Sequence, residues 1–537
     1  MKQSTPRSKG WRGEFRPVRR IQTALAMAAA LGVCVQAQAA GLDETVAGSR
    51  ALGRAAGQVS ANDFMATWLN PANLAAVPNN DLGFELRVPL FQGCFDRARD
   101  NSLDYQQQNP DAGITGSESF GKVCNSAPPG PTGHFGWAES FDEGWGYGIG
   151  FFTPAAIPGY KYGQPTIISS GISDNDIYAP TLNGVESPNR FLLLEREALA
   201  GYLMAGVGAS PIPELRVGFS GGVGFATINN LVAASAVGGT FTDPEILSEI
   251  SVADWIVPRF TASIVAAPGG DVELMASLTF QDDIRASGHL DLDANGYQGV
   301  PLRDCRVTTD RGEGPVGASG TRCRLEDIQL RVPLPTLEAF VGFRYAALRG
   351  ERKRAMDPMV DEAWDIELNA YWSQTSHVDK YQLTFHDEEF APGSPQVALS
   401  GTATAPGLPA PEGATINRQW NDTFGVRLGG DVNILPKTFS VRWGLSAESR
   451  AVPKNNMNID IWPVGKLGLH VGATVAVDNF RLTVGYAHLF YESITVPVGQ
   501  GGAKEIASQN PDKALGVNEG NFSASLDVIS LGGSASF

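Results

Sequence analysis

One segment of the sequence has the spacing of a hydrolase nucleophile. Gly218-Phe219-Ser220-Gly221-Gly222 matches the Gly-x-Ser-x-Gly pattern, in which the serine stands on a sharp turn between a strand and a helix. Here an apolar alternation continues unbroken from residue 215 to residue 225, which predicts one continuous strand. We therefore expect no catalytic residue and no enzyme activity, and we interpret the small residues as places where strands or a ligand pass closely.

A second segment has part of the oxygen-ligand pattern of a calcium loop. Asp291, Asp293 and Asn295 stand at alternate positions, followed by Gly296 where such a loop turns. Leu302 occupies the twelfth position, where a bidentate glutamate belongs. A surface calcium site and the polar start of a loop are the two interpretations. The six histidines form no close pair with metal spacing, and we expect no other metal and no cofactor.

An N-terminal leader precedes the elements that would position such residues. Residues 1–39 contain a basic stretch, an apolar stretch over residues 21–35 and the small-x-small pattern Ala37-Gln38-Ala39, the three parts of a secretory signal peptide. The apolar stretch is shorter than the roughly 20 residues that span a bilayer. We predict secretion through the inner membrane with cleavage near Ala39. The net charge of −16 becomes more negative without the basic leader, so nucleic acid is not an expected partner.

Four cysteines follow the leader, an even number that fits disulfides in an oxidising compartment. Neither neighbouring pair has the short Cys-x₂₋₄-Cys spacing of a zinc site. Proximity in the sequence pairs Cys94 with Cys124 and Cys305 with Cys323. Each disulfide would then close one loop.

Alternation with a period of two residues dominates the chain after residue 80. Residues 424–434 and 439–448 alternate apolar and polar side chains across the tight turn Leu435-Pro436-Lys437. Residues 272–292 keep their even positions largely apolar for longer than a soluble strand runs. The charged residues of the polar face, which we expect to form a network in a lumen, are Arg427, Asp431, Arg442 and Glu448.

The connections and the end of the chain indicate a membrane barrel. Tight turns alternate with long polar loops, as periplasmic turns and extracellular loops do in outer-membrane barrels. The last residues alternate and stop on an aromatic side chain, a pattern that resembles the signal read by the barrel-assembly machinery at Ser530, Gly532, Ala535 and Phe537. We predict an all-β transmembrane antiparallel barrel over residues 81–537, with about fourteen to sixteen strands.

The segment between the leader and the first strand resembles a known family. Ala40-Gly41-Leu42 is followed by a Gly-Leu-Gly-Arg-Ala-like stretch at residues 48–57 and by Asn70-Pro71-Ala72. These motifs resemble the FadL/TodX family of outer-membrane channels for long-chain fatty acids and related hydrophobic compounds. Ala51 and Asn73 stand where many members have glycine. The resemblance covers roughly residues 40–76.

The resemblance implies that residues 40–80 form a hatch inside a fourteen-stranded barrel, and that movement of this hatch gates transfer. It places Ala40, Gly41 and Leu42 near an internal hydrophobic ligand. Asn70 and Pro71 also fit the first two positions of a helix. An ordinary periplasmic linker is the alternative interpretation. The hatch residues predicted on the same motifs are Gly53, Arg54, Asn70, Pro71 and Ala72.

A second segment predicts a helix in an extracellular loop. Asp243 suits the helix N-cap, Pro244 the first turn, and acidic side chains follow. The apolar side would form an exposed capture surface, as the resemblance implies, or pack against the barrel rim. The residues expected in this capture loop are Ile246, Leu247, Ile250 and Trp255.

Together these features predict passive uptake of long-chain fatty acids or other hydrophobic compounds across the outer membrane of a Gram-negative cell. Expected partners are hydrophobic small molecules (fatty acid, lipid or aromatic), outer-membrane lipids and the barrel-assembly machinery. A general polar porin, which would lack the hatch and the apolar loop, is one alternative. A surface-exposed structural or adhesive barrel with disulfide-stapled acidic loops is another.

Overall fold

The computed structural model describes one barrel and the segment that enters it. The described residues are 47–78, 80–98, 122–141, 143–153, 159–162, 166–167, 178–179, 181–182, 185–186, 189–235, 245–293, 308–309, 312–313, 322–385, 413–504 and 516–537. The predicted signal peptide, Ala40, Gly41, Leu42, Asn295 and Cys305 lie outside these ranges. None of the described helices is long and apolar enough to cross a membrane.

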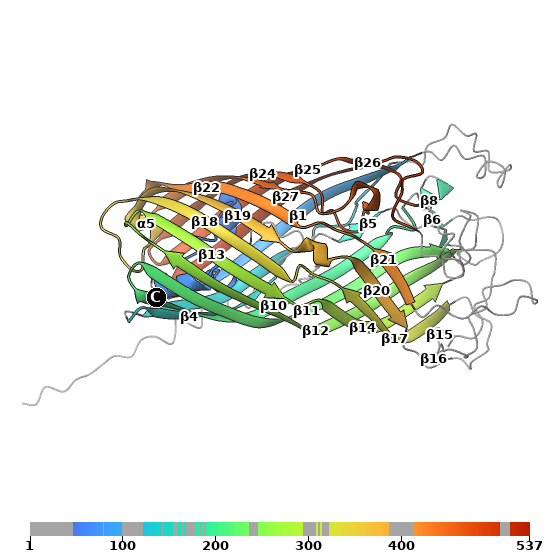
Figure 1. Cartoon of the computed structure of the whole chain (residues 1–537), viewed down its shortest axis with the longest axis horizontal. Coiled ribbons are helices and arrows are strands. Elements are labelled where there is room, and N and C mark those ends of the chain that lie inside the picture. Colours follow the sequence, from blue (N-terminus) through green and yellow to red (C-terminus); the bar gives the residue numbers. More distant parts are fainter. Residues whose placement is uncertain are drawn as a thin grey trace, which may run out of the picture. The chain divides into compact units, whose positions relative to one another are not determined.

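The chain forms a closed antiparallel barrel of fourteen strands (Figure 1). The continuous strands are β1 (Asp81–Arg97), β10 (Glu195–Ile212), β11 (Leu215–Ser235), β12 (Glu245–Ala266), β23 (Phe439–Glu448), β24 (Lys466–Val477), β25 (Phe480–Tyr491) and β27 (Gly520–Ser536). The interrupted strands are β2 (Val123–Cys124) with β3 (Thr132–Phe141), β4 (Trp145–Phe152) with β5 (Tyr160–Lys161), β13 (Val272–Gln281) with β14 (Ile284–Asp293), β17 (Arg322–Val332) with β18 (Leu337–Leu348), β19 (Glu362–Ser373) with β20 (Lys380–Phe385), and β21 (Gly413–Asn417) with β22 (Thr423–Leu435).

Short elements complete the described chain. The hatch segment contains α2 (Ser49–Arg54), α3 (Ala66–Leu69) and the 3₁₀ helix η1 (Pro71–Ala76). Connections between strands contain α5 (Pro358–Asp361), η3 (Thr375–His377), η5 (Lys454–Asn456) and β26 (Ile494–Val496), which pairs with β27. The isolated two-residue pairs are β6 (Thr166–Ile167) with β7 (Tyr178–Ala179), β8 (Thr181–Leu182) with β9 (Val185–Glu186), and β15 (Thr308–Thr309) with β16 (Gly312–Glu313).

The last strand closes the barrel against the first. The β1–β27 register runs from Asp81 opposite Ser536 to Arg97 opposite Gly520. The predicted terminal strand is therefore confirmed, with Ser530, Gly532 and Ala535 inside it and Phe537 just beyond its end. Closure pairs β1 with β27 along the whole length of both strands, as a bilayer interior demands of backbone groups. Recognition of this strand by the assembly machinery stays a prediction.

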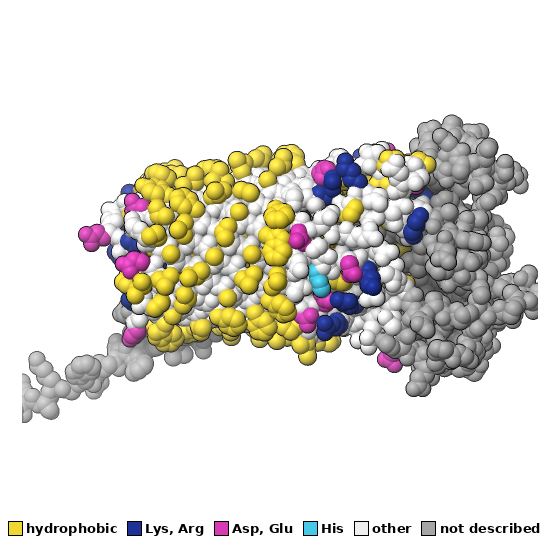
Figure 2. Space-filling view, viewed as in Figure 1, with side chains coloured by type: hydrophobic (Ala, Val, Ile, Leu, Met, Phe, Trp, Pro, Cys, Tyr) yellow, Lys and Arg dark blue, Asp and Glu magenta, His cyan; other side chains and the backbone are white. Residues whose placement is uncertain are grey.

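The alternation places apolar side chains outside and polar side chains inside the membrane part of the barrel. Phe424 and Val426 on β22 are exposed, whereas Arg427 and Asp431 between such residues are buried. Apolar side chains form a band, the apolar belt, across the corresponding part of the face shown in Figure 2, and charged residues gather at the boundary of this band. Arg427, Asp431 and Arg442 are buried on the inner face, and Glu448 is partly buried. The predicted charge network is confirmed for Asp431 and Arg442, which form an ion pair, whereas the Arg427 guanidinium lies 4.7 Å above the Tyr371 ring.

The helix predicted in the capture loop is wrong. Residues 245–266 form β12, which pairs with β11 along one edge and with β13 and β14 along the other. A helix would leave backbone groups of both neighbours unpaired, and ladder bonds outweigh one favourable N-cap. Asp243 and Pro244 lie outside the described residues. By contrast, β11 runs through Ser220, which confirms the continuous strand predicted across the Gly-x-Ser-x-Gly motif.

Candidate functional site: the hatch and the inner wall

The described part of the predicted hatch lies inside the barrel. Nearly every residue from 47 to 78 is buried, and α2 lies within the ring of strands (Figure 1). All five predicted hatch residues in this range, Gly53, Arg54, Asn70, Pro71 and Ala72, are buried. Since side chains alone do not fill a lumen of this strand number, a folded segment occupies it.

Arg54 connects α2 to the polar inner wall. Its guanidinium is fully buried and lies 2.9 Å from Asp365, 3.3 Å from Glu367 and 3.2 Å from Asp431. Burial alone would lower the pKa of Arg54, but these carboxylates outweigh burial and raise it. Removal of one partner from a buried ion cluster leaves uncompensated charge, at a cost of about 3–5 kcal/mol. Arg54 is therefore the main electrostatic anchor of the hatch.

The carboxylates around Arg54 belong to a longer network in the wall. Arg344 on β18 contacts Asp365 at 2.6 Å, Glu273 at 2.7 Å and Glu362 at 2.5 Å. Arg442 on β23 contacts Asp431 at 3.3 Å. The network holds the carboxylates in place from β13 to β23, so Arg54 enters a preformed site. Sequence alternation predicted charged residues in the lumen but not their connection to the hatch.

Backbone contacts hold the same helix close to the wall. A Cβ on Gly429 would lie 1.7 Å from the carbonyl oxygen of Arg54, so only glycine fits there. His470 Nδ1 donates to the carbonyl oxygen of Leu52 at 2.8 Å. The hydroxyls of Ser49 and Ser530 are 2.5 Å apart. The wall of β22–β27 is therefore shaped around the backbone of α2.

The second half of the hatch packs against the opposite strands. Trp68 lies 5.5 Å from Phe152 and 5.6 Å from Tyr202, measured between ring centroids, and the Arg259 guanidinium lies 4.0 Å above the Trp68 ring. Such a cation–π contact stabilises by about 2 kcal/mol when desolvated. A Cβ on Gly218 would lie 2.2 Å from the backbone of η1. This contact explains the glycine at position 218 of the Gly-x-Ser-x-Gly segment.

Asn70 has a different role from the one predicted. It precedes η1, and Pro71 is the first residue of that helix, as expected. The Asn70 side chain makes no capping bond and donates instead to the Gln58 carbonyl oxygen at 2.7 Å. Asn73 donates to the carbonyl oxygens of Val59 and Ala61, each at 2.7 Å. Both side chains therefore form hydrogen bonds within the hatch segment.

The inner wall changes character along β12. In the membrane part of the strand, Arg259 and Thr261 are buried and Phe260 is exposed. Before residue 254, toward the start of β12, the buried and exposed positions exchange. The even-numbered Ile250 and Val252 are buried there, whereas the odd-numbered positions are buried in the membrane part. A bulge causes the reversal, since Trp255 and Ile256 of β12 stand opposite the single residue between Gly224 and Ala226 of β11. One extra residue turns every following side chain to the other face.

The neighbouring strand reverses at the same height. Leu274 and Leu278 of β13 are exposed, whereas Ile284 and Leu290 of β14 are buried. The even positions of residues 272–292 therefore do not share one face as predicted, because the strand breaks at residues 282–283. The backbone N–H of Arg285 donates to Asp254 at 2.7 Å, which joins the break to the bulge. The buried apolar residues of this upper wall are Ala226, Ile228, Ile250, Val252, Ile284, Ala286, Leu290, Ile328 and Leu330.

This arrangement divides the predicted capture residues. Ile250 lies in the apolar upper wall, whereas Trp255 points outward at the bulge and is 69% exposed. Ile246 and Leu247 belong to β12, but their side chains lie outside the described set. Neither the bulge nor the reversal was predicted. Two adjacent large apolar residues, Trp255 and Ile256, interrupt the alternation and were the available signal.

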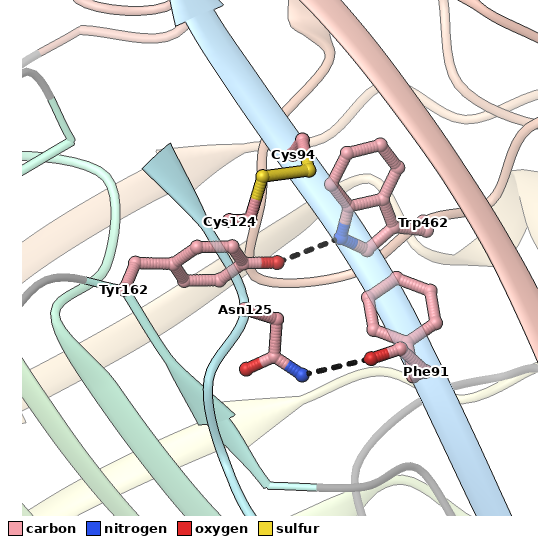
Figure 3. The surroundings of a disulfide bond; sticks show 6 residues. All are labelled: Phe91, Cys94, Cys124, Asn125, Tyr162 and Trp462. Atoms are coloured by element: carbon pink, nitrogen blue, oxygen red, sulfur yellow. Dashed lines mark hydrogen bonds between the residues drawn. A yellow bond between two sulfur atoms is a disulfide. The ribbon is translucent and has the colours of Figure 1, made fainter. Parts of the chain in front are cut away.

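Residues 449–465 enter the extracellular end of the lumen, which sequence analysis missed. Asp460 in this segment binds Arg418, with Arg196 at 3.4 Å. Burial opposes ionisation of Asp460, but the two arginines outweigh burial and lower its pKa. Trp462 is fully buried and donates to the Tyr162 hydroxyl at 3.2 Å (Figure 3). Polar and aromatic contacts together fix the segment inside the barrel.

One predicted disulfide borders this region. Cys94 on β1 and Cys124 on β2 are opposite in register and are bonded, which confirms the pairing (Figure 3). The second pair falls outside the description, since Cys305 and the side chain of Cys323 are not described. Both carboxylate oxygens of Asp291 accept from Arg324 at 2.6 Å. The described residues contain no group of three or more acidic, histidine or cysteine side chains placed to bind a metal.

Solved structures with the same fold identify its class. No protein-family model and no curated protein sequence matches the chain. A FadL homologue of Pseudomonas aeruginosa is similar with a TM-score of 0.61 and 14% identity, over 93% of this chain and 99% of that one. The toluene transporter TodX of P. putida gives 0.57 and 12%, over 92% and 99%. The Ralstonia pickettii toluene transporter TbuX gives 0.53 and 11%, over the same shares. The chain thus has the FadL-type barrel fold.

Proposed function

We propose that this protein is an outer-membrane channel for the passive uptake of hydrophobic compounds, gated by residues 40–80. The observation that carries the proposal is the reversal at the bulge, which gives the extracellular part of the lumen an apolar wall. A polar solute gains nothing from such a wall, whereas a hydrophobic molecule gains about 25 cal/mol per Å² of apolar surface removed from water. Ile250 belongs to this capture wall.

The fold similarity supports the same cargo class. TodX and TbuX are toluene transporters by name, and long-chain fatty acids are the second cargo that the motifs at residues 40–76 imply. A signal peptide over residues 1–39 would deliver the chain across the inner membrane. The barrel-assembly machinery would then insert it through the terminal strand. The apolar belt would contact outer-membrane lipids.

The proposed gate is the hatch. In the resting channel, the Arg54 cluster holds α2 against the wall, and Trp68 holds the second half. Uptake requires this segment to move, because it lies across the lumen between the apolar wall and the periplasm. Ala40, Gly41 and Leu42 would lie near the ligand, as the resemblance implies.

A cross-link tests the gate. Cysteines at Ser49 and Ser530 would form a disulfide between hatch and wall, since the two native hydroxyls are 2.5 Å apart. We expect uptake of a labelled fatty acid or of toluene by cells to stop in the oxidised double variant and to return after reduction. The single variants, and the wild type with reductant, control for assembly and for the native disulfide. Unchanged uptake in a fully cross-linked protein would contradict gating by movement of α2.

The compound bound to the purified protein and its ion conductance together test the polar-porin alternative. We expect mass spectrometry of the natively extracted protein to find a stoichiometric hydrophobic compound, with little ion conductance in planar bilayers. High conductance and no bound hydrophobe would favour the porin. None of the described contacts specifically favours an adhesive role.

A further inference from the structure

The outer surface of the barrel contains a hollow over the ends of β22–β25. Its volume is about 540 Å³, which lies in the range of about 300–1,000 Å³ found for small-molecule sites. Phe424 and Val426 form one side, and Leu467 and Phe490 form the other. Ala447 lies between Val426 and Leu467 in the register, so a small side chain separates the larger ones.

The hollow exists because the wall ends early at this position. Glu448, the last residue of β23, pairs with Lys466, the first residue of β24. The connection between them turns into the lumen, where Trp462 is fully buried. Ser449 and Gly465, which begin and end this connection, line the hollow. The inward turn therefore leaves a recess on the outer surface.

The polar groups of the recess lie at its extracellular end. Arg450 and Glu492 form a salt bridge of 2.6 Å, and both side chains are about one third exposed. Lys466 lies 3.2 Å from Glu448 beneath them. The opposite end continues into the apolar belt through Leu469 and Val471 of β24, which are both exposed. The recess is thus apolar toward the membrane centre and charged toward the extracellular side.

We propose that this recess binds one acyl chain of an outer-membrane lipid. The recess opens on the apolar belt, where the neighbouring molecules in a membrane are lipids. A chain lying between Val426 and Leu467 over Ala447 gains dispersion contacts on several sides, which a convex part of the belt does not offer. The Arg450–Glu492 pair then lies at the level of the polar headgroup. This site is on the outside of the wall and is separate from the proposed uptake path.

The test uses the full-length protein in vesicles of phosphatidylethanolamine and phosphatidylglycerol. A trace of phosphatidylethanolamine with a diazirine near the headgroup end of one acyl chain serves as the probe. Mass spectrometry then maps the labelled residues after illumination. We expect labelling at Leu467 and Phe490 about tenfold above that at Leu203 and Val207, which corresponds to 1.4 kcal/mol of preferential binding.

Two variants separate a site from general lipid contact. Ala447→Phe fills the recess and should reduce the labelling to the level of Leu203. Ala473→Phe places the same ring elsewhere on the outward face of β24 and should leave the labelling unchanged. Equal labelling around the whole belt in the wild type would overturn the proposal. So would loss of the label on addition of fatty acid or toluene, since that result assigns the recess to cargo.

Discussion

The two halves of β12 differ in which face is apolar. In the membrane half, Phe260 contacts the outside and Arg259 faces the lumen, whereas in the extracellular half Ile250 faces the lumen. The bulge at Trp255 and Ile256 produces the difference, although apolar residues recur with a period of two on both sides of it. One strand can therefore meet lipid outside the lower half and offer apolar surface inside the upper half. The polar lower lumen holds residues 47–78, and β12 and β14 contribute an apolar wall to the upper lumen.

The largest expected effect concerns the lower half. Arg54→Ala leaves Asp365, Glu367 and Asp431 buried without their common partner, and should destabilise hatch docking by about 3–5 kcal/mol. We expect raised ion conductance in planar bilayers and faster proteolysis within residues 47–78. Arg285→Ala is the control, because its salt bridge to Asp282 is exposed and is worth at most about 1 kcal/mol. Equal effects of the two variants would show that Arg54 is no anchor.

The outer face of β12 gives the next effect. Phe260→Lys places a charge against lipid in the apolar belt and should destabilise the barrel by about 2–4 kcal/mol. Ser251→Lys, on the outer face beyond the bulge, should change stability by less than about 0.5 kcal/mol. Urea unfolding in lipid vesicles measures both. Similar losses in the two variants would mean that the membrane boundary does not lie at the bulge.

A smaller effect is expected from pH. Loss of water around the partly buried Asp63 carboxyl raises its pKa, although Arg50 acts in the opposite direction. Hatch docking is then strongest below the ordinary Asp pKa of about 4 and weakens as pH rises through the raised pKa. Proteolysis of residues 47–78 should therefore accelerate between acidic and neutral pH. Asp63→Asn should weaken this dependence, and an unchanged profile in that variant would exclude Asp63 as a source.

Much of the fold could be predicted because the strands of a membrane barrel alternate apolar and polar residues. The alternation of residues 424–434, the turn at residues 435–437 and the terminal strand were all confirmed. The motifs at residues 48–57 and 70–72 fall in a segment that is buried within the barrel, while its role as a hatch stays a prediction. These features depend on local residue types and on the physical demand for an apolar outer face.

The remaining features depend on contacts between distant residues. The helix predicted after Asp243 failed because pairing with β11 and β14 outweighed a local cap. In residues 272–292 the apolar residues stay at even positions across a strand break. The sequence pattern therefore cannot show that these positions change from the outer to the inner face. Asp365 and Glu367 were not predicted to bind Arg54, since nothing in their own strand specifies a partner 311 or 313 residues away. The inward turn of residues 449–465 was not predicted either, because it also depends on contacts with residues distant in the sequence.

Uptake by two variants of adjacent residues tests the central claim most directly. Ile250→Glu places a charge on the apolar inner wall, whereas Ser251→Glu places the same charge on the outer face. Cells with equal amounts of folded barrel are given labelled fatty acid or toluene at limiting concentration. We predict a loss of about tenfold for Ile250→Glu, equivalent to 1.4 kcal/mol of cargo affinity, and no loss for Ser251→Glu. Equal uptake by both variants would contradict the apolar capture wall.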